Sequence, residues 1–227
     1  MTNWDLVAIA AILLIGVPHG GLDGAVARRV GWSDGALAWL GFHLAYIVLA
    51  ALVVLLWWLW PAPSLTVFLC VSALHFGLSD ILNHESAKHE EVGQHWLPVI
   101  AHGGLVSIAI PSVNPALVAP LFGVLIGDEA GEALTHTIGM LWAPWLLAVC
   151  AYCGYALLVP AWRKPLFNLL ALLALVFLLP PLLSFALYFC LWHSRRHTLR
   201  IWHSLQGKTE RKRSFTEATV YSLLAWT

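Results

Sequence analysis

The chain has 227 residues, of which 60% are hydrophobic and 11% are charged. This composition excludes an ordinary soluble domain and is typical of a polytopic membrane protein. The formal net charge is zero, and no basic face interleaved with aromatic residues predicts nucleic-acid binding.

Long apolar segments recur along the chain, and a helix needs about 20 such residues to cross the hydrocarbon core. The first segment has no basic residue before it and no small-residue cleavage site after it, which indicates a retained helix and not a signal peptide. We expect one integral-membrane domain over residues 1–227, an all-α polytopic transmembrane helix bundle of about seven spans, at Trp4–Leu22, Ala36–Trp60, Ser64–Leu82, Gln94–Ile110, Met140–Val159, Pro165–Leu179 and Leu182–Ser204.

Prolines and short apolar runs set the breaks between these spans. Residues 61–63 (Pro-Ala-Pro) and 180–181 (Pro-Pro) are expected to form turns, because proline breaks the helical hydrogen-bond ladder. Ala116–Ile126 is too short to span and is predicted to lie at the membrane interface. A last apolar run begins at Phe215 and is also too short to cross, which suggests a truncated terminus or a missing final helix.

The basic residues predict the orientation of the helices, because Lys and Arg concentrate in short cytoplasmic loops. With the amino terminus outside, the loops after the first, third, fifth and seventh helices are cytoplasmic. Every Lys and Arg then falls on the inner side, as Arg28, Arg29, Lys88, Arg163, Lys164, Arg195, Arg196, Arg200, Lys208, Arg211, Lys212 and Arg213. The sequence therefore predicts an inner-membrane protein of a prokaryote with this orientation.

His193 and His197 follow an almost unbroken apolar run that starts at Leu166. Residues four apart lie on one face of a helix, so two neighbouring imidazoles could share a metal ion. Ionisable residues inside a membrane are costly and are therefore candidates for function.

Two further histidines are expected at a similar depth, in the inner halves of the first and third helices. They are His19, which follows Pro18, and His75. The sequence thus predicts a metal site among the first, third and seventh helices. Asp23 and Asp80 follow these histidines and could accept their second N–H, as carboxylates often do for ligating imidazoles, although a helix-end or loop role is equally open.

Other residues near these histidines could line an apolar substrate pocket. The candidates are Phe76, His102, Tyr188, Phe189 and Trp192. The remaining histidines have simpler interpretations, with His43 as a packed or hydrogen-bonded core residue, His136 in an outer loop, His203 off the face of His197, and His84, His89 and His95 solvated in an inner loop. The four cysteines, Cys70, Cys150, Cys153 and Cys190, lie in apolar runs and are read as small hydrophobic residues.

Imidazole ligands suit Zn, Cu, Fe and Ni, so the donor type alone does not select the metal. An all-histidine set leaves the positive charge of the metal uncompensated, which suits a reducible ligand such as O2. A site in the inner half of the bilayer also indicates a lipid-soluble substrate. Together these points favour a non-haem iron oxygenase over a hydrolase.

Three motifs resemble those of the Brp/Blh family of membrane carotenoid oxygenases. Residues 18–23 (PHGGLD) resemble its PHGxLDH motif, residues 75–80 (HFGLSD) its HFGxSD motif, and residues 188–197 (YFCLWHSRRH) its YFxxWHSxRH motif. Members of this family are β-carotene 15,15′-dioxygenases, which split the central double bond with iron and O2 to give two retinal molecules.

The resemblance implies that His19, His75, His193 and His197 are the catalytic residues and hold Fe(II). It also implies β-carotene or a related carotenoid and O2 as substrates, and retinal as a product that could pass to a rhodopsin apoprotein. The chain departs from the family at Gly24, where a His is usual, at residues 101–103 (Ala-His-Gly), where Arg-Gly is expected, and at residues 113–115 (Val-Asn-Pro), where Phe-His-Pro is expected.

Two other functions are compatible with intramembrane histidines. One is a transporter that uses them as a metal or proton relay, for which carboxylates within the helices and broken helices in paired halves would be expected. The other is a di-haem membrane cytochrome with histidine pairs as axial ligands.

Overall fold

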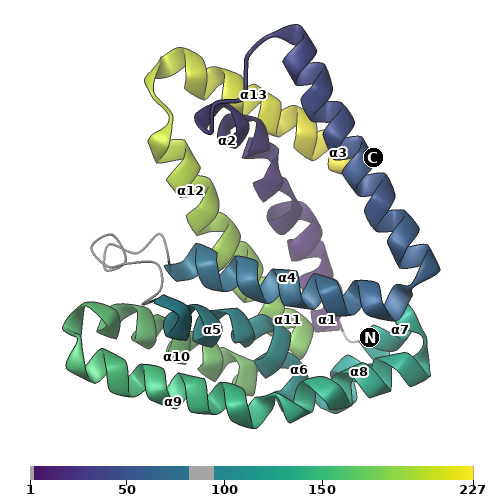
Figure 1. Cartoon of the computed structure of the whole chain (residues 1–227), viewed down its shortest axis with the longest axis vertical. Coiled ribbons are helices and arrows are strands. Elements are labelled where there is room, and N and C mark those ends of the chain that lie inside the picture. The colour runs from purple at the N-terminus through teal and green to yellow at the C-terminus, as the bar shows by residue number, and fades with distance from the viewer. Residues whose placement is uncertain (1–2, 82–94, 227) are drawn as a thin grey trace. The chain divides into compact units, whose positions relative to one another are not determined.

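The computed structural model describes residues 3–81 and 95–226, with the side chains of Val17 and His19 outside this description (Figure 1). All regular elements in the described part are helices. The chain divides into two compact units, the first formed by Met1–Leu55 with Ala186–Thr227 and the second by Leu56–Phe185.

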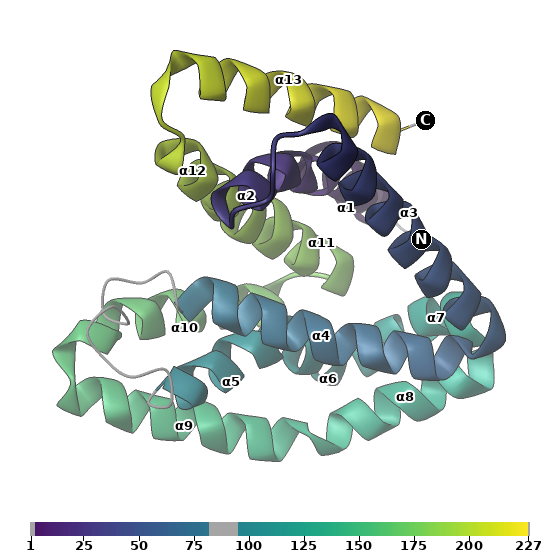
Figure 2. The same ribbon diagram turned by 45° about the horizontal axis from the view of Figure 1, so that its top comes forward.

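The first unit combines the two ends of the chain. In order, its helices are α1 (Asn3–Ala11), η1 (Ile12–Gly16), η2 (Val17–Leu22), α2 (Asp23–Arg29), α3 (Ala36–Leu59, up to Leu55), η7 (Leu187–Ser194), α12 (Arg195–Ser204) and α13 (Gly207–Ala225). A small buried core joins the amino-terminal and carboxyl-terminal helices and consists of Leu22, Ala25, Ile201 and Leu205. The yellow helix α13 packs against η2 and α2, as Figure 2 also shows.

The second unit is formed by the middle of the chain. Its helices are α4 (Pro61–Ile81), α5 (Trp96–Gly104), η5 (Leu105–Ala109), α6 (Ile110–Val113), α7 (Pro115–Ile126), α8 (Asp128–Met140), α9 (Trp142–Leu158), η6 (Pro160–Trp162), α10 (Arg163–Leu178) and α11 (Pro181–Ala186, up to Phe185). Small residues permit the close packing of α4 on α5, because a Cβ on Gly103 would overlap the carbonyl of Ala73 and one on Gly77 that of Val99.

Six helices in the described part are long and apolar enough to cross a membrane, at Asn3–Arg29, Ala36–Leu59, Pro61–Ile81, Trp96–Val113, Asp128–Leu158 and Pro160–Leu178. The all-α membrane class is therefore confirmed. The expected seventh span is also helical, from Pro181 to Ser204. It is not one of the six, because histidines and arginines make its carboxyl-terminal half polar.

The prolines expected in turns begin helices instead. Pro61 is the first residue of α4, and Pro181 is the first residue of α11. The turn predicted at residues 61–63 was wrong, and the one predicted at residues 180–181 holds for Pro180 but not for Pro181, because proline is tolerated in the first helical turn, where its missing N–H needs no acceptor. The chain breaks one residue earlier, at Trp60 and at Pro180.

Several segments outside the expected spans also form helices, among them α2 and α8, and α8 contains His136, which was wrongly predicted in an outer loop. The segment predicted at the interface is helical as α7, Pro115–Ile126, and is too short to be a candidate span. The final apolar run belongs to α13, which begins before it, at Gly207. This run has a packing partner within the first unit, because α13 lies against η2.

Candidate metal centre and neighbouring polar clusters

His193 and His197, which we call the histidine pair, lie side by side in the first unit. Their ring centroids are 6.3 Å apart, and the ring planes differ by only 13°. His193 is 1% exposed, whereas His197 is partly buried. The structure therefore brings together the two imidazoles that the spacing of four residues placed on one face.

The backbone that carries His193 is not an ordinary α-helix. Leu187–Ser194 forms the π-helix η7, and α12 continues directly from it at Arg195. Extended π-helical stretches are rare, and short π-helical insertions are frequent at functional sites. A continuous α-helix was predicted here, because the apolar composition of this segment does not indicate the wider turn of a π-helix.

Aromatic rings cover one side of the histidine pair. The ring of Phe189 stacks on His193 with a centroid distance of 6.1 Å and an angle of 12°, and Tyr188 lies at the same distance with an angle of 29°. Trp192 instead stacks under the guanidinium of Arg196, 4.2 Å from its ring centroid. Of the predicted pocket residues, Phe189 and Tyr188 thus contact His193, whereas Trp192 forms a cation–π pair with Arg196.

The first helix runs alongside the helix of the histidine pair. A Cβ on Gly16 would overlap the ring of Phe189, and Leu22 packs with Ile201 in the small core. Gly16 and Leu22 precede and follow His19, whereas Phe189 and Ile201 precede and follow the histidine pair. The contacts on either side of His19 are thus made with residues on either side of the pair, while the side chain of His19 itself lies outside the described part.

Asp23, the expected partner of a ligating histidine, accepts a hydrogen bond from the hydroxyl of Tyr46. Close by, Nε2 of His43 lies 3.0 Å from the hydroxyl of Tyr221. These four side chains and Gly20 line a cavity of about 220 Å³. His43 is hydrogen-bonded, but the prediction of a core residue was wrong because its side chain is exposed. Both tyrosines were missed because Tyr46 on α3 and Tyr221 on α13 are distant from Asp23 in sequence.

In the second unit, His75 is exposed on α4. Its ring meets that of the buried Phe76 edge to face, with centroids 5.6 Å apart at 60°. Phe76 in turn lines an apolar cavity of this unit. The structure thus places one more of the predicted pocket residues beside a predicted ligand.

Asp80 and His102 form a buried pair within the second unit. Nδ1 of His102 lies 3.6 Å from a carboxylate oxygen of Asp80, and both side chains are less than 5% exposed. The ring of the fully buried Tyr152 lies 6.1 Å from that of His102. Asp80 was expected beside His75, and His102 was expected in a substrate pocket. The structure instead pairs Asp80 with His102 in the packed interior of the second unit.

His95 is also buried, although it was predicted to be solvated. It begins the fourth apolar segment just before α5, is 1% exposed and lies 5.4 Å from the ring of Trp162, which is itself fully buried. The prediction was wrong because it rested on the polar residues that precede His95, whereas the contact with Trp162 joins residues that are distant in sequence. The other two histidines of that loop, His84 and His89, lie outside the described residues.

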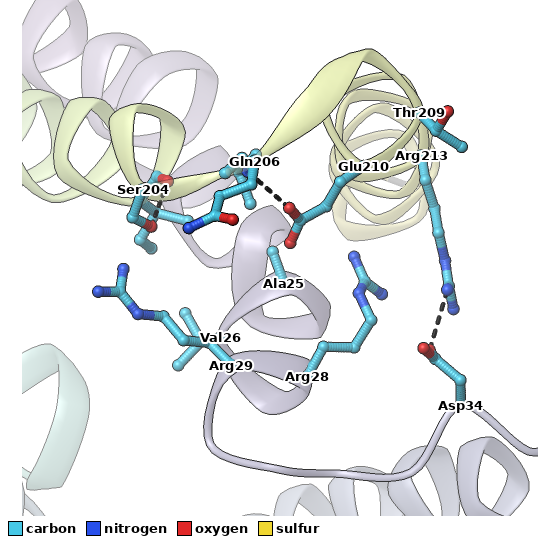
Figure 3. A pocket seen from close by; sticks show the side chains of 12 residues that line it. Ala25, Val26, Arg28, Arg29, Asp34, Ser204, Gln206, Thr209, Glu210 and Arg213 are labelled. Carbon is cyan, nitrogen blue, oxygen red and sulfur yellow. Dashed lines mark hydrogen bonds and ion pairs between the residues drawn. The ribbon is translucent and has the colours of Figure 1, made fainter.

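In the first unit, residues of α2, α12 and α13 and the loop after α2 carry a network of ion pairs around a cavity of about 630 Å³ (Figure 3). Arg28 donates to Glu217, and Arg213 donates to Asp34, each at 2.9 Å. Burial raises the pKa of the Asp34 carboxyl, but hydrogen bonds from Arg213 and Trp39 outweigh burial and hold this pKa below its usual value. Basic residues that the sequence assigned to separate loops therefore share one cluster.

Gly24, where the resembling family usually has His, lies under this cluster. A Cβ at this position would lie 3.0 Å from a carboxylate oxygen of Glu217 and 3.2 Å from the ring of Trp39. The departure from the motif thus coincides with the close approach of α13 in this chain.

The described residues hold the histidine pair but not a complete metal site. Among residues 3–81 and 95–226, without the side chain of His19, no three His, Cys, Asp or Glu side chains are grouped so that they could bind a metal ion. His75 belongs to the other unit. The four-histidine site therefore stays a prediction, of which the structure supplies two adjacent donors.

These features define an integral-membrane helical protein with a buried pair of imidazoles. The sequence profile of the β-carotene 15,15′-dioxygenase family matches residues 10–227. A β-carotene 15,15′-dioxygenase from uncultured marine bacterium 66A03 is 34% identical over 223 residues, which cover 98% of this chain and 78% of the relative. The "Probable beta-carotene 15,15′-dioxygenase Blh" of Halobacterium salinarum is 27% identical over 85% of this chain.

The chain belongs to the β-carotene 15,15′-dioxygenase family. The resemblance seen in the three motifs is thereby confirmed, and the class of enzyme is a carotenoid-cleaving dioxygenase. The match spans 60% of the length of the Halobacterium relative, less than two thirds. No solved structure matches the chain.

Proposed function

We propose that this chain cleaves the central 15,15′ double bond of β-carotene with O2 and releases two molecules of retinal. The double bond breaks, and each of its two carbons receives one oxygen atom as an aldehyde, so one O2 accounts for both products. The observation that carries this proposal is the family match, which runs from residue 10 to residue 227 and includes all four predicted ligands. Both relatives are named for the same activity, the Halobacterium relative as a probable one.

We also propose that His19, His75, His193 and His197 hold Fe(II). The histidine pair fits this role, because its two nearly parallel imidazoles lie 6.3 Å apart and imidazole is a suitable donor for iron. When bound, iron would supply the activation of O2, which carbon–carbon cleavage requires. Nitrogen donors are suitable for iron, and a set without carboxylates leaves the metal its positive charge.

The protein's own contribution is to orient the imidazoles and to exclude water. Phe189 and Tyr188 stack on His193 and limit its rotation. The close contact of Gly16 with Phe189 holds this aromatic layer against the first helix. A dry and rigid surrounding also protects an oxidising site from side reactions.

The membrane setting agrees with a substrate and a product that dissolve in lipid. We propose seven spans with the amino terminus outside, in a prokaryotic inner membrane, with Pro181–Ser204 as the seventh. The cluster of Arg28, Arg29 and Arg213 then lies at the cytoplasmic side, as the distribution of basic residues requires. Retinal would leave into the membrane, where a rhodopsin apoprotein could take it up.

Family membership favours this proposal over a transporter or a di-haem cytochrome. The direct test is expression of the chain in cells that make β-carotene. We expect the colour to fade and retinal to accumulate, and purified protein to contain iron but to lack a Soret band. Persistent colour and absent retinal in cells that accumulate the folded protein would refute the activity, and vesicle uptake of metal would instead support transport.

A further inference from the structure

The second unit contains an apolar cavity of about 280 Å³ that is bounded by several helices. Its wall includes Leu65 and Phe76 of α4, Ile110 of α6, Val118 and Phe122 of α7, and Phe185 of α11. The helix α7 contacts both α4 and α6 in this unit. Among the described residues, no charged side chain lines the cavity, and Ser72 supplies its one side-chain hydroxyl.

The cavity adjoins a predicted iron ligand. Ser72 and Phe76 both line it, and they lie three residues before and one residue after His75 on α4. Residues three and four apart share a helix face, and the ring of His75 meets that of Phe76 directly, with centroids 5.6 Å apart. The wall of the cavity therefore lies within one helical turn of His75, whose own exposed side chain is not part of that wall.

The chemistry of the wall selects an uncharged hydrocarbon. An apolar cavity does not hold water well, because water needs two or more polar partners. Its volume lies near the lower end of the roughly 300–1,000 Å³ that is usual for small-molecule pockets. The cavity is thus suited to the end of a long hydrocarbon and too small for the whole of one.

We infer that this cavity binds one terminal ring of β-carotene and the adjoining part of its polyene chain. This inference rests on the proposed function, which supplies a substrate that is a pure hydrocarbon with a ring at each end. The cavity would anchor the ring while the polyene passes His75, so that the distance from ring to central double bond sets the point of cleavage.

Two valines on α7 offer a matched test. Val118 is 4% exposed and lines the cavity, whereas Val124 on the same helix is 86% exposed and does not line it. Both V118F and V124F are made in a His193→Ala background, which we expect to retain substrate without turning it over. The proteins are purified from cells that make β-carotene, and the visible absorption per mole of protein is measured.

V118F should lower the bound carotenoid by roughly 10-fold, because an added ring occupies the binding space and overpacks a close-packed site. V124F should leave it unchanged. In the otherwise unaltered chain, V118F should lower kcat/KM for β-carotene more than for lycopene, whose ends carry no ring. Equal carotenoid retention in V118F and V124F would overturn the inference.

The other outcomes are also distinguishable. If V118F does not accumulate as a monodisperse protein, Leu121→Phe, which changes a partly buried lining residue of the same helix, replaces it in the same measurements. If phospholipid per mole of protein falls in the cavity variant while carotenoid does not, a lipid chain occupies the cavity and the inference fails. If the unaltered chain forms no retinal, the proposed function fails, whereas an active chain with unaffected cavity variants refutes the inference alone.

Discussion

Each unit contains one deeply buried histidine in an otherwise apolar helix, but the two imidazoles have opposite surroundings. His193 in the first unit lies among stacked rings, next to a second imidazole on a π-helix. His102 in the second unit lies 3.6 Å from the carboxylate of Asp80 in the packed interior. Burial alone therefore does not identify a metal ligand, because the two buried imidazoles have different neighbours.

The largest difference between the two histidines should appear in iron content and retinal formation when each imidazole is removed in turn. We expect His193→Ala to lower retinal formation by at least ~100-fold, because even partners of metal ligands contribute 10–100-fold, and to remove most of the bound iron. Retinal is measured by chromatography and iron by elemental analysis of the purified protein.

His102→Leu is the matched control and should retain iron at the level of the unaltered chain. Loss of iron in the His102 variant but not in the His193 variant would reverse the assignment of the two histidines.

In the second unit, removal of the His102 imidazole should lower the stability of the fold. We expect His102→Leu to lower the free energy of unfolding by about 1–3 kcal/mol, because it removes one partner of a buried polar pair. The measurement is the midpoint of thermal unfolding in detergent.

Asp80→Asn tests the same pair from the other side, since an amide keeps the size and one acceptor. It should cost less than His102→Leu. Unaltered midpoints in both variants would show that the 3.6 Å contact contributes nothing to stability.

A smaller difference between the two units is expected when one buried glycine in each unit is replaced by alanine. A Cβ on Gly16 would overlap the ring of Phe189, and one on Gly104 would overlap the indole of Trp145. Overpacking costs about 1–3 kcal/mol, so both Gly16→Ala and Gly104→Ala should lower the unfolding midpoint. Gly16→Ala alone should also lower the iron content, because Phe189 stacks on His193.

Gly154→Ala in α9 is the control for these two variants, because no atom lies within 4 Å of the added Cβ. Its unfolding midpoint should be no lower than that of the unaltered chain. Equal iron contents in the Gly16 and Gly104 variants would argue against a role of the Phe189 stack in holding the histidine pair.

The smallest effect concerns the ion pairs between the loop after α2 and the helix α13 in the first unit. Arg213 and Trp39 lower the pKa of the Asp34 carboxyl against the effect of burial. A lowered pKa contributes stability above the ordinary value of 3.8, and this contribution is lost as the pH falls through the folded value. The unfolding midpoints of the unaltered chain and of Asp34→Asn should therefore differ slightly near neutral pH and converge below pH 3.8. A difference that persists in acid would show that Asp34 acts through something other than its charge.

Much of the architecture could be predicted from hydropathy, because each span must satisfy its own backbone hydrogen bonds in lipid and must therefore be an apolar helix. The helices at Ala36–Leu59, Trp96–Val113 and Pro160–Leu178 follow this rule. The turns at the prolines were misplaced because a proline that ends one helix can begin the next. The buried state of His95 was missed because Trp162, its neighbour, is far away in sequence.

The sequence by itself determined the membrane class, the four candidate ligands and the face shared by His193 and His197, because composition and helical spacing are local properties. The tertiary structure decided the rest: the π-helix under His193, the pairing of Asp80 with His102, the hydrogen bond of Tyr46 to Asp23 and the apolar cavity beside His75. These features depend on which helices pack together, and helix packing depends on side-chain shape across segments that are distant in the chain.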